Sequence, residues 1–248
     1  MRIRAAKLAA SFSVLLALLF AVPALALMVR PVVVELTSSG GGANGSLEVV
    51  NDRNRPVTVE VKVQKLTLPQ RGDPVLTPDS GADFLIFPPI ANIKPGARQV
   101  LRVRYIGPAD IPATRLYMFA TSELPVAPDP TEKRAQVQVL YSINSVVAVT
   151  PPKAKPDIKI AAIERAKNAK GEPGVYVTFE NDGAAHGFVG NATLELTSGA
   201  WHKDFDQKQV GEAFGLGLVP AQAKRDMFIA IADVPANGSI SGDIKLER

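Results

Sequence analysis

The sequence contains 248 residues, with 28 Lys and Arg against 24 Asp and Glu, two His and no Cys. The absence of Cys excludes disulfides, thiolate nucleophiles and cysteine-ligated metal centres, and two imidazoles argue against a Ser-His-Asp triad or a multi-histidine metal site. With 46% hydrophobic and 21% charged residues, the chain can bury a substantial core, and its length suits two domains of about 100 residues each.

Residues 1–26 have the three-part layout of a secretory signal peptide. Basic residues at positions 2, 4 and 7 precede an apolar run, and the segment ends in Ala24-Leu25-Ala26. We expect cleavage after Ala26 and a soluble exported product. An uncleaved membrane anchor is the alternative, because the apolar run approaches the length that spans a bilayer. Cleavage leaves 25 basic against 24 acidic residues, a net charge of +1 in place of +4, and so no compositional reason to expect nucleic acid as a partner.

Apolar and polar residues then alternate with a period of two. Valines at positions 57, 59, 61 and 63 alternate with polar residues, and Leu47 and Val49 do the same in the preceding run. This pattern predicts half-buried antiparallel strands. Further strands are expected at residues 32–36, 84–87, 99–106, 116–122 and 137–149. About seven short strands within 120 residues indicate an immunoglobulin-like sandwich, which we assign to residues 27–150.

A second strand-rich block follows a stiff connection. Residues 151–156 contain three prolines, which do not support a sheet ladder. Residues 157–248 form the second predicted immunoglobulin-like domain, with strands at 175–179, 191–196, 227–231 and 240–246 and one possible helix at 161–170. Both blocks have a strand that runs into Asn-Asp, at Asn51-Asp52 and Asn181-Asp182, which hints at a tandem repeat. The predicted fold is therefore all-β, with two immunoglobulin-like sandwiches in tandem.

Motifs that could carry chemistry have simpler structural interpretations. The glycine-rich segment 40–45 lacks the Lys-Ser or Lys-Thr of a phosphate loop and is expected to be a hairpin loop. His186 and His202 are expected to be structural. Arg98, Arg102 and Arg104 share one strand face, which favours a solvated surface over a phosphate or carboxylate site. We therefore expect no enzyme activity, no cofactor and no metal.

The run from Ala135 to Val149 is unusually long for one strand. It contains 15 residues and would span roughly 50 Å as one strand, whereas a typical strand contains about five or six residues. Two shorter strands joined by a bend near Asn144-Ser145 would explain it. Alternatively, one end projects a row of apolar side chains that completes the sheet of another protein.

Several segments in fixed order resemble the periplasmic pilus (PapD-like) chaperone family, over about residues 29–151. They are Asn51-Asp52, the block from Phe87-Pro88-Pro89 through Gly96 to Arg102, the segment Leu116–Phe119 leading to Glu123-Leu124-Pro125, and the long strand. The chain resembles a divergent branch of that family.

The resemblance implies an L-shaped periplasmic chaperone that binds newly exported pilin or fimbrial subunits and delivers them to an outer-membrane usher. Such subunits lack their last strand, and the last strand of the first chaperone domain replaces it by donor-strand complementation. The donor residues would be Val137, Val139, Tyr141 and Ile143, with Ile143 nearest the cleft. An exposed strand of this kind is prone to association, so we also expect a self-capping homodimer before subunit binding.

The chain departs from the family in the cleft between domains. Positions where the best-known members carry an Arg and a Lys for the carboxylate of the subunit hold Pro31 and Val146. Candidate substitutes are Arg30, Arg115 and Asn144.

The interdomain charge cluster of the family is also reduced. Arg102 matches it, whereas Thr114 and Thr150 stand where an acid and an Arg are expected. An exported module that binds carbohydrate or a surface polymer through its loops is the alternative function, and an unrecognised hydrolase is a further alternative.

Overall fold

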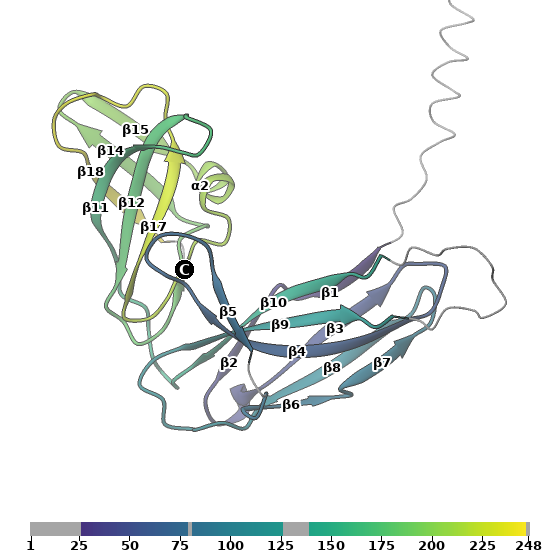
Figure 1. Cartoon of the computed structure of the whole chain (residues 1–248). Helices are drawn as coiled ribbons and strands as arrows, with labels where there is room; N and C mark the ends of the chain where they lie inside the picture. Colours follow the sequence, from purple (N-terminus) through teal and green to yellow (C-terminus); the bar gives the residue numbers. More distant parts are fainter. Residues whose placement is uncertain (1–25, 79–80, 126–138, 247–248) are drawn as a thin grey trace, which may run out of the picture.

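The computed structural model describes residues 26–78, 81–125 and 139–246, which form two β domains arranged as an L (Figure 1). No sheet mixes strands of the two domains. The first domain contains β1 (Leu27–Arg30), β2 (Val33–Thr37), the short 3-10 helix η1 (Gly41–Ala43), β3 (Asn44–Asn51), β4 (Val57–Thr67), β5 (Val75–Pro78), β6 (Phe84–Phe87), β7 (Ile90–Ile93), β8 (Arg98–Tyr105), β9 (Arg115–Glu123) and β10 (Ser142–Thr150). The all-β expectation is confirmed.

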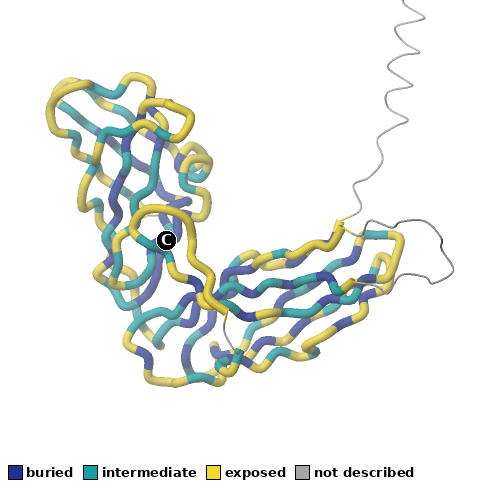
Figure 2. The backbone as a smooth tube through the Cα atoms, viewed as in Figure 1, coloured by how far each residue is buried: buried dark blue, intermediate teal, exposed yellow. Residues whose placement is uncertain are grey.

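Two sheets cover each other in the first domain. One has the order β1-β3-β8-β6, and the other has the order β2-β10-β9-β4-β5 with β7 also paired to β4. Their facing sides bury large side chains, among them Leu47, Leu101 and Phe119. Phe84 closes one end of this core, with its ring edge-on to Tyr117 at 4.8 Å between centroids. Figure 2 shows that the buried residues lie mostly within the strands, where they alternate with more exposed ones, and that many of the connecting loops are exposed.

The second domain contains β11 (Ile158–Lys167), β12 (Pro173–Asn181), β13 (Gly187–Phe188), β14 (Thr193–Ser198), β15 (Trp201–Phe205), the helix α2 (Gln207–Phe214), β16 (Leu218–Val219), β17 (Ala223–Ala230) and β18 (Ser241–Lys245). Its sheets have the orders β11-β12-β17, β15-β14-β18 and β13-β16. Its core includes Phe179, Leu194, Leu196 and Val210.

The helix expected at residues 161–170 is wrong. These residues belong largely to β11, which pairs with β12 and has a register shift between Ile160 and Ala162. A bulge of this kind adds one residue to a strand, so Ile160 and Ile163 pack against the same core despite a spacing of three. The real helix, α2, follows Asp206, whose side chain accepts a hydrogen bond from the backbone of Gln209.

The Asn residues of the two Asn-Asp sequences have the same structural role in the two domains. Asn51 and Asn181 are both fully buried at the end of a strand. The amide nitrogen of Asn51 donates to the carbonyls of Arg55 and Ile93, both at 2.9 Å. That of Asn181 donates to Ala185 at 2.8 Å. In both cases the side-chain oxygen accepts from the backbone two residues later. One buried amide therefore organises the turn after the strand in each domain.

Candidate functional site

The hairpin of β9 and β10 carries the segment singled out as a donor strand. The two strands pair without a break from Ser142 opposite Ser122 to Val149 opposite Arg115. No bend occurs at Asn144-Ser145, so that interpretation of the long run is wrong. The strand is also shorter than expected, because β10 begins at Ser142 and not at residue 137.

β10 has a partner on its second side only along part of its length. It pairs with β2 in parallel from Val146 to Thr150, and the backbone N–H of Val146 donates to Val32 at 2.8 Å. Before Val146, β10 pairs with β9 alone among the described strands. The first four residues of β10, 142–145, therefore have an open edge.

Three apolar residues in succession precede this open edge. Val139, Leu140 and Tyr141 are 60%, 46% and 50% exposed and lie outside the strand. Ile143, within β10, is partly buried and packs against the core. Val137 lies outside the described residues. Exposure of consecutive large apolar side chains is costly in an isolated chain and is typical of a binding surface.

A buried ion-pair cluster lies where β9 ends and β10 begins. The carboxylate of Glu123, at the end of β9, is 1% exposed and lies 2.9 Å from the guanidinium of Arg53. It also pairs with Arg55, which is 44% exposed. Arg53 in turn stacks on the ring of Tyr141 at 4.4 Å, and the backbone N–H of Glu123 donates to the Tyr141 carbonyl at 2.8 Å. The cluster thus fixes the point where the chain enters β10. It was missed from the sequence because its members are far apart.

The three candidate cleft residues lie in different environments. Asn144 is exposed and shares its side of β10 with Val146 and Ala148, which pack toward Leu218 of the second domain. Arg30 lies on β1, where its Nε donates to Glu48 at 2.5 Å. Arg115 lies on the core side of β9, with its guanidinium 3.8 Å from Asp83. Of the three, only Asn144 faces the cleft.

Pro31 and Val146, the two positions that the resemblance singles out, lie near each other. The hydroxyl of Ser145 donates to the Pro31 carbonyl at 3.2 Å, and Val146 is buried against the second domain. A cavity of about 390 Å³ lies beside Val146 between the domains. Leu66, Met118 and Leu218 also line it, so this part of the cleft is mainly apolar.

His186 joins the domains through polar contacts with Glu35 and Thr114 of the first domain. Its ring is buried, and Nε2 lies 2.9 Å from a carboxylate oxygen of Glu35 on β2. The hydroxyls of Thr114 and Thr150 lie 3.0 Å apart, and the backbone N–H of His186 donates to Thr114 at 3.1 Å. The structural role expected of His186 is therefore a contact between domains.

A second attachment comes from the turn between β4 and β5. Arg71 donates to Asp226 on β17 and to Glu164 on β11, both at 2.8 Å, and stacks on Tyr176. Gln70 also donates to Asp226, at 3.0 Å. Burial alone would raise the pKa of Asp226, but the hydrogen bonds from Gln70, Thr178 and Arg71 outweigh it and hold the pKa below its ordinary value. The carboxylate is therefore kept charged at the joint.

Arg102 is not part of this joint in the structure. It lies on the exposed side of β8, between Ser46 of β3 and Phe87 of β6. None of the interdomain hydrogen bonds or ion pairs of the described residues involves it. Arg98, Arg102 and Arg104 are all exposed on one side of β8, as their alternation predicts.

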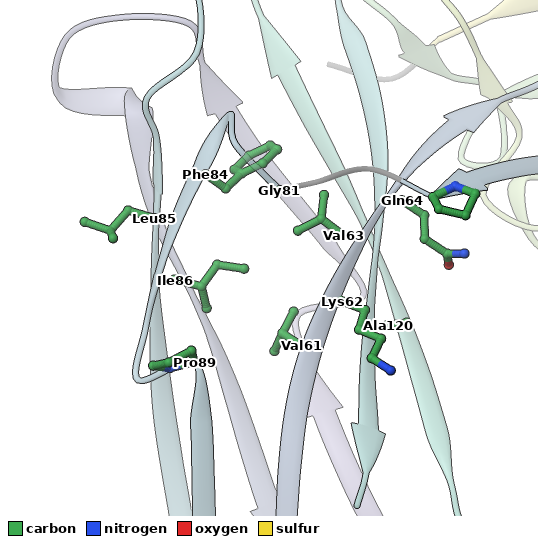
Figure 3. A pocket seen from close by; sticks show the side chains of 11 residues that line it. Val61, Lys62, Val63, Gln64, Gly81, Phe84, Leu85, Ile86, Pro89 and Ala120 are labelled. Carbon is green, nitrogen blue, oxygen red and sulfur yellow. The ribbon is translucent and has the colours of Figure 1, made fainter.

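A separate cavity opens at the other edge of the first domain. It has a volume of about 770 Å³ and lies between β4 and β6, where Val61, Val63, Phe84 and Ile86 turn toward one another (Figure 3). β9 separates β4 from β10 in the sheet order. Ala120 of β9 also lines this cavity, which is therefore separate from the open edge of β10 but not from the whole hairpin.

Comparisons with known proteins identify the family. The model of the pili and flagellar-assembly chaperone family, PapD N-terminal domain, matches residues 26–155. The chain belongs to this family. It is a pilus-assembly chaperone and not an enzyme. A search of curated proteins finds no match.

Solved structures agree with the fold over both domains. The class 5 fimbrial chaperone CfaA aligns at 10% identity with a TM-score of 0.52, covering 90% of this chain and all of the other. A chain from the complex of the Salmonella enterica SafA pilin with the SafB chaperone aligns at 16% identity with a TM-score of 0.50, covering 92% of this chain and 99% of the other. In the part of the chain that the structure describes, no helix has the length and apolar character to cross a membrane.

Proposed function

We propose that this chaperone captures pilin subunits in the periplasm by donor-strand complementation through the start of β10. The observation that carries the proposal is the open edge of residues 142–145, continuous with the exposed apolar residues 139–141. An open edge offers unpaired backbone groups to a partner strand, and the alternating side chains fill pockets in the partner.

The parity of the side chains supports this assignment. Val139, Tyr141 and Ile143 have the same parity as Val147 and Val149, which point into the core of the first domain. In an extended conformation they would form one row with a repeat of roughly 6.6 Å, and Val137 would continue it. Leu140 has the opposite parity and would point away from the partner.

The remaining steps of the proposal concern export and delivery. The predicted signal peptide would direct the mature chain to the periplasm, and an outer-membrane usher would receive the loaded complex. Before loading, two chaperones would cover their open edges in a homodimer. Asn144 is the proposed polar contact for the bound subunit in the cleft, because Arg30 and Arg115 are engaged by Glu48 and Asp83.

The experiment compares three single substitutions in an exported, tagged chaperone. Val139→Asp and Tyr141→Asp place a charge in the donor row, and Leu140→Asp places the same charge at the adjacent position of opposite parity. We expect the first two to abolish co-purification of pilin subunits, while Leu140→Asp retains most of it. Circular dichroism checks that all three variants fold. Equal capture by Tyr141→Asp and the unmodified chaperone would refute the proposal.

A further inference from the structure

The outward face of the sheet β1-β3-β8-β6 has an unusual charge. It carries Arg30, Arg98, Arg102 and Arg104 against one acid, Glu48, and four minus one is a net of +3. The chain beyond residue 26 has a net charge of only +1. The rest of the chain therefore has a net negative charge. The excess positive charge of the whole chain is concentrated on this face.

Two of these arginines, Arg102 and Arg104, have no ionic partner in the part of the chain that the structure describes. Glu48 accepts hydrogen bonds from Arg30, which lower its pKa, and lies 3.5 Å from Arg98. Among the described residues, no ion pair involves Arg102 or Arg104. Their guanidinium groups thus remain available for an anionic partner, and guanidinium binds phosphate in a bidentate manner.

Large apolar side chains stand directly beside these two arginines. Arg102 is opposite Phe87 and Arg104 is opposite Leu85 in the register of β8 and β6. Phe87 is 68% exposed and Leu85 is 58% exposed, and Val100 between the arginines of β8 is 46% exposed. β6 is the edge strand of its sheet, so its side chains lie at the rim of the face.

We propose that this face binds the surface of an anionic lipid bilayer. A broad sheet face with cations and apolar residues side by side matches a bilayer surface, where phosphate groups lie next to apolar chains. Arg102 and Arg104 would bind phosphates, and Phe87 and Leu85 would insert between headgroups. The face belongs to the sheet opposite the one that contains β10, so a membrane-bound chaperone keeps its donor strand accessible.

The experiment measures partition of the mature chain onto vesicles by co-sedimentation. We compare neutral phosphatidylcholine vesicles with vesicles that contain phosphatidylglycerol, at low and high salt. We expect binding only to the anionic vesicles, and weaker binding at high salt because salt screens exposed charges. Each arginine near an anionic surface changes partition about five-fold, so Arg102→Gln with Arg104→Gln should reduce it roughly 30-fold.

A matched control separates this face from net charge. Lys167→Gln with Lys170→Gln removes two exposed charges from the second domain and should change partition less than two-fold. Phe87→Ser should reduce partition several-fold without changing charge. Failure of the unmodified chain to bind anionic vesicles at low salt would overturn the proposal, and so would an equal loss in the lysine variant. Full binding by Phe87→Ser would also contradict it. Pilin capture is measured in parallel and should be unchanged in all of these variants.

Discussion

The buried cluster around Glu123 gives a sharp test of how the donor hairpin is held. Replacing Glu123 with Gln keeps the size of the side chain and one accepting oxygen, but it removes the charge and puts an NH2 donor in place of the second accepting oxygen. Arg53, whose side chain is 10% exposed, then loses its carboxylate partner and remains nearly buried. We expect the first domain to be destabilised, because an unpaired buried charge is expensive.

The magnitude follows from the exposure of each partner. Removing one member of a buried ion pair costs roughly 3–5 kcal/mol, and the one accepting oxygen that Gln retains offsets part of this, so we expect a loss of about 2–4 kcal/mol. Arg55 pairs with the same carboxylate but is 44% exposed. Arg55→Ala should therefore cost only about 0–1 kcal/mol, because exposed ion pairs contribute little.

Denaturant unfolding followed by circular dichroism measures both losses. Fluorescence of Trp201, the only tryptophan, reports separately on the second domain. The dichroism transition of Glu123→Gln should move to lower denaturant concentration, whether or not the two domains unfold together. A loss below about 1 kcal/mol, equal to that of Arg55→Ala, would show that the buried cluster does not stabilise the hairpin.

Two further predictions concern pH. Asp226 has a lowered pKa in the folded chain, so its contribution to stability is present above its ordinary pKa of 3.8 and is lost as the pH falls through the lower folded value. Asp226→Asn should cost about 1–2 kcal/mol at pH 7, and unfolding curves of the variant and the unmodified chain should converge toward pH 2; a constant difference would contradict the assignment. Burial raises the pKa of Tyr117, and its hydroxyl donates to Asp83 at 2.9 Å, which raises it further. This contribution is complete below pH 10 and is lost as the pH rises through the folded value. Tyr117→Phe should cost about 1 kcal/mol at pH 7 and less at pH 11, and an equal cost at both pH values would refute this.

The strands with regular alternation could be predicted from the sequence, because period two follows directly from a sheet with one buried face. β6 is found at the predicted residues, and β8 and β9 differ from prediction by one residue at each end. β11 was misread because its bulge changes the spacing of the isoleucines. The helix α2 is only eight residues long, and it was overlooked although Asp206 and Gln209 have the spacing of a capping box.

The contacts between the domains could not be predicted in the same way. Glu35 and His186 are 151 positions apart, and Gln70 and Asp226 are 156 apart. No local pattern encodes which polar residues meet after two sandwiches dock. The substitutions of Thr114 and Thr150 were visible in the sequence as missing charges. In the structure the two hydroxyls lie 3.0 Å apart, the backbone N–H of His186 donates to Thr114, and the imidazole of His186 contacts Glu35.

The net charge of the chain likewise does not predict how charges are distributed over its surface. A net charge near zero after signal removal argues against a polyanionic partner only if charges are spread evenly over the surface. Here alternation places every second residue of β8 on one face, so Arg98, Arg102 and Arg104 point to the same side, and sheet pairing brings Arg30 to that side as well. An electrostatic interaction depends on local charge within about a Debye length, roughly 10 Å at 0.1 M salt, and not on the total. A chain with a net charge of +1 can therefore present one face with a net charge of +3, and an anionic partner would be attracted to that face.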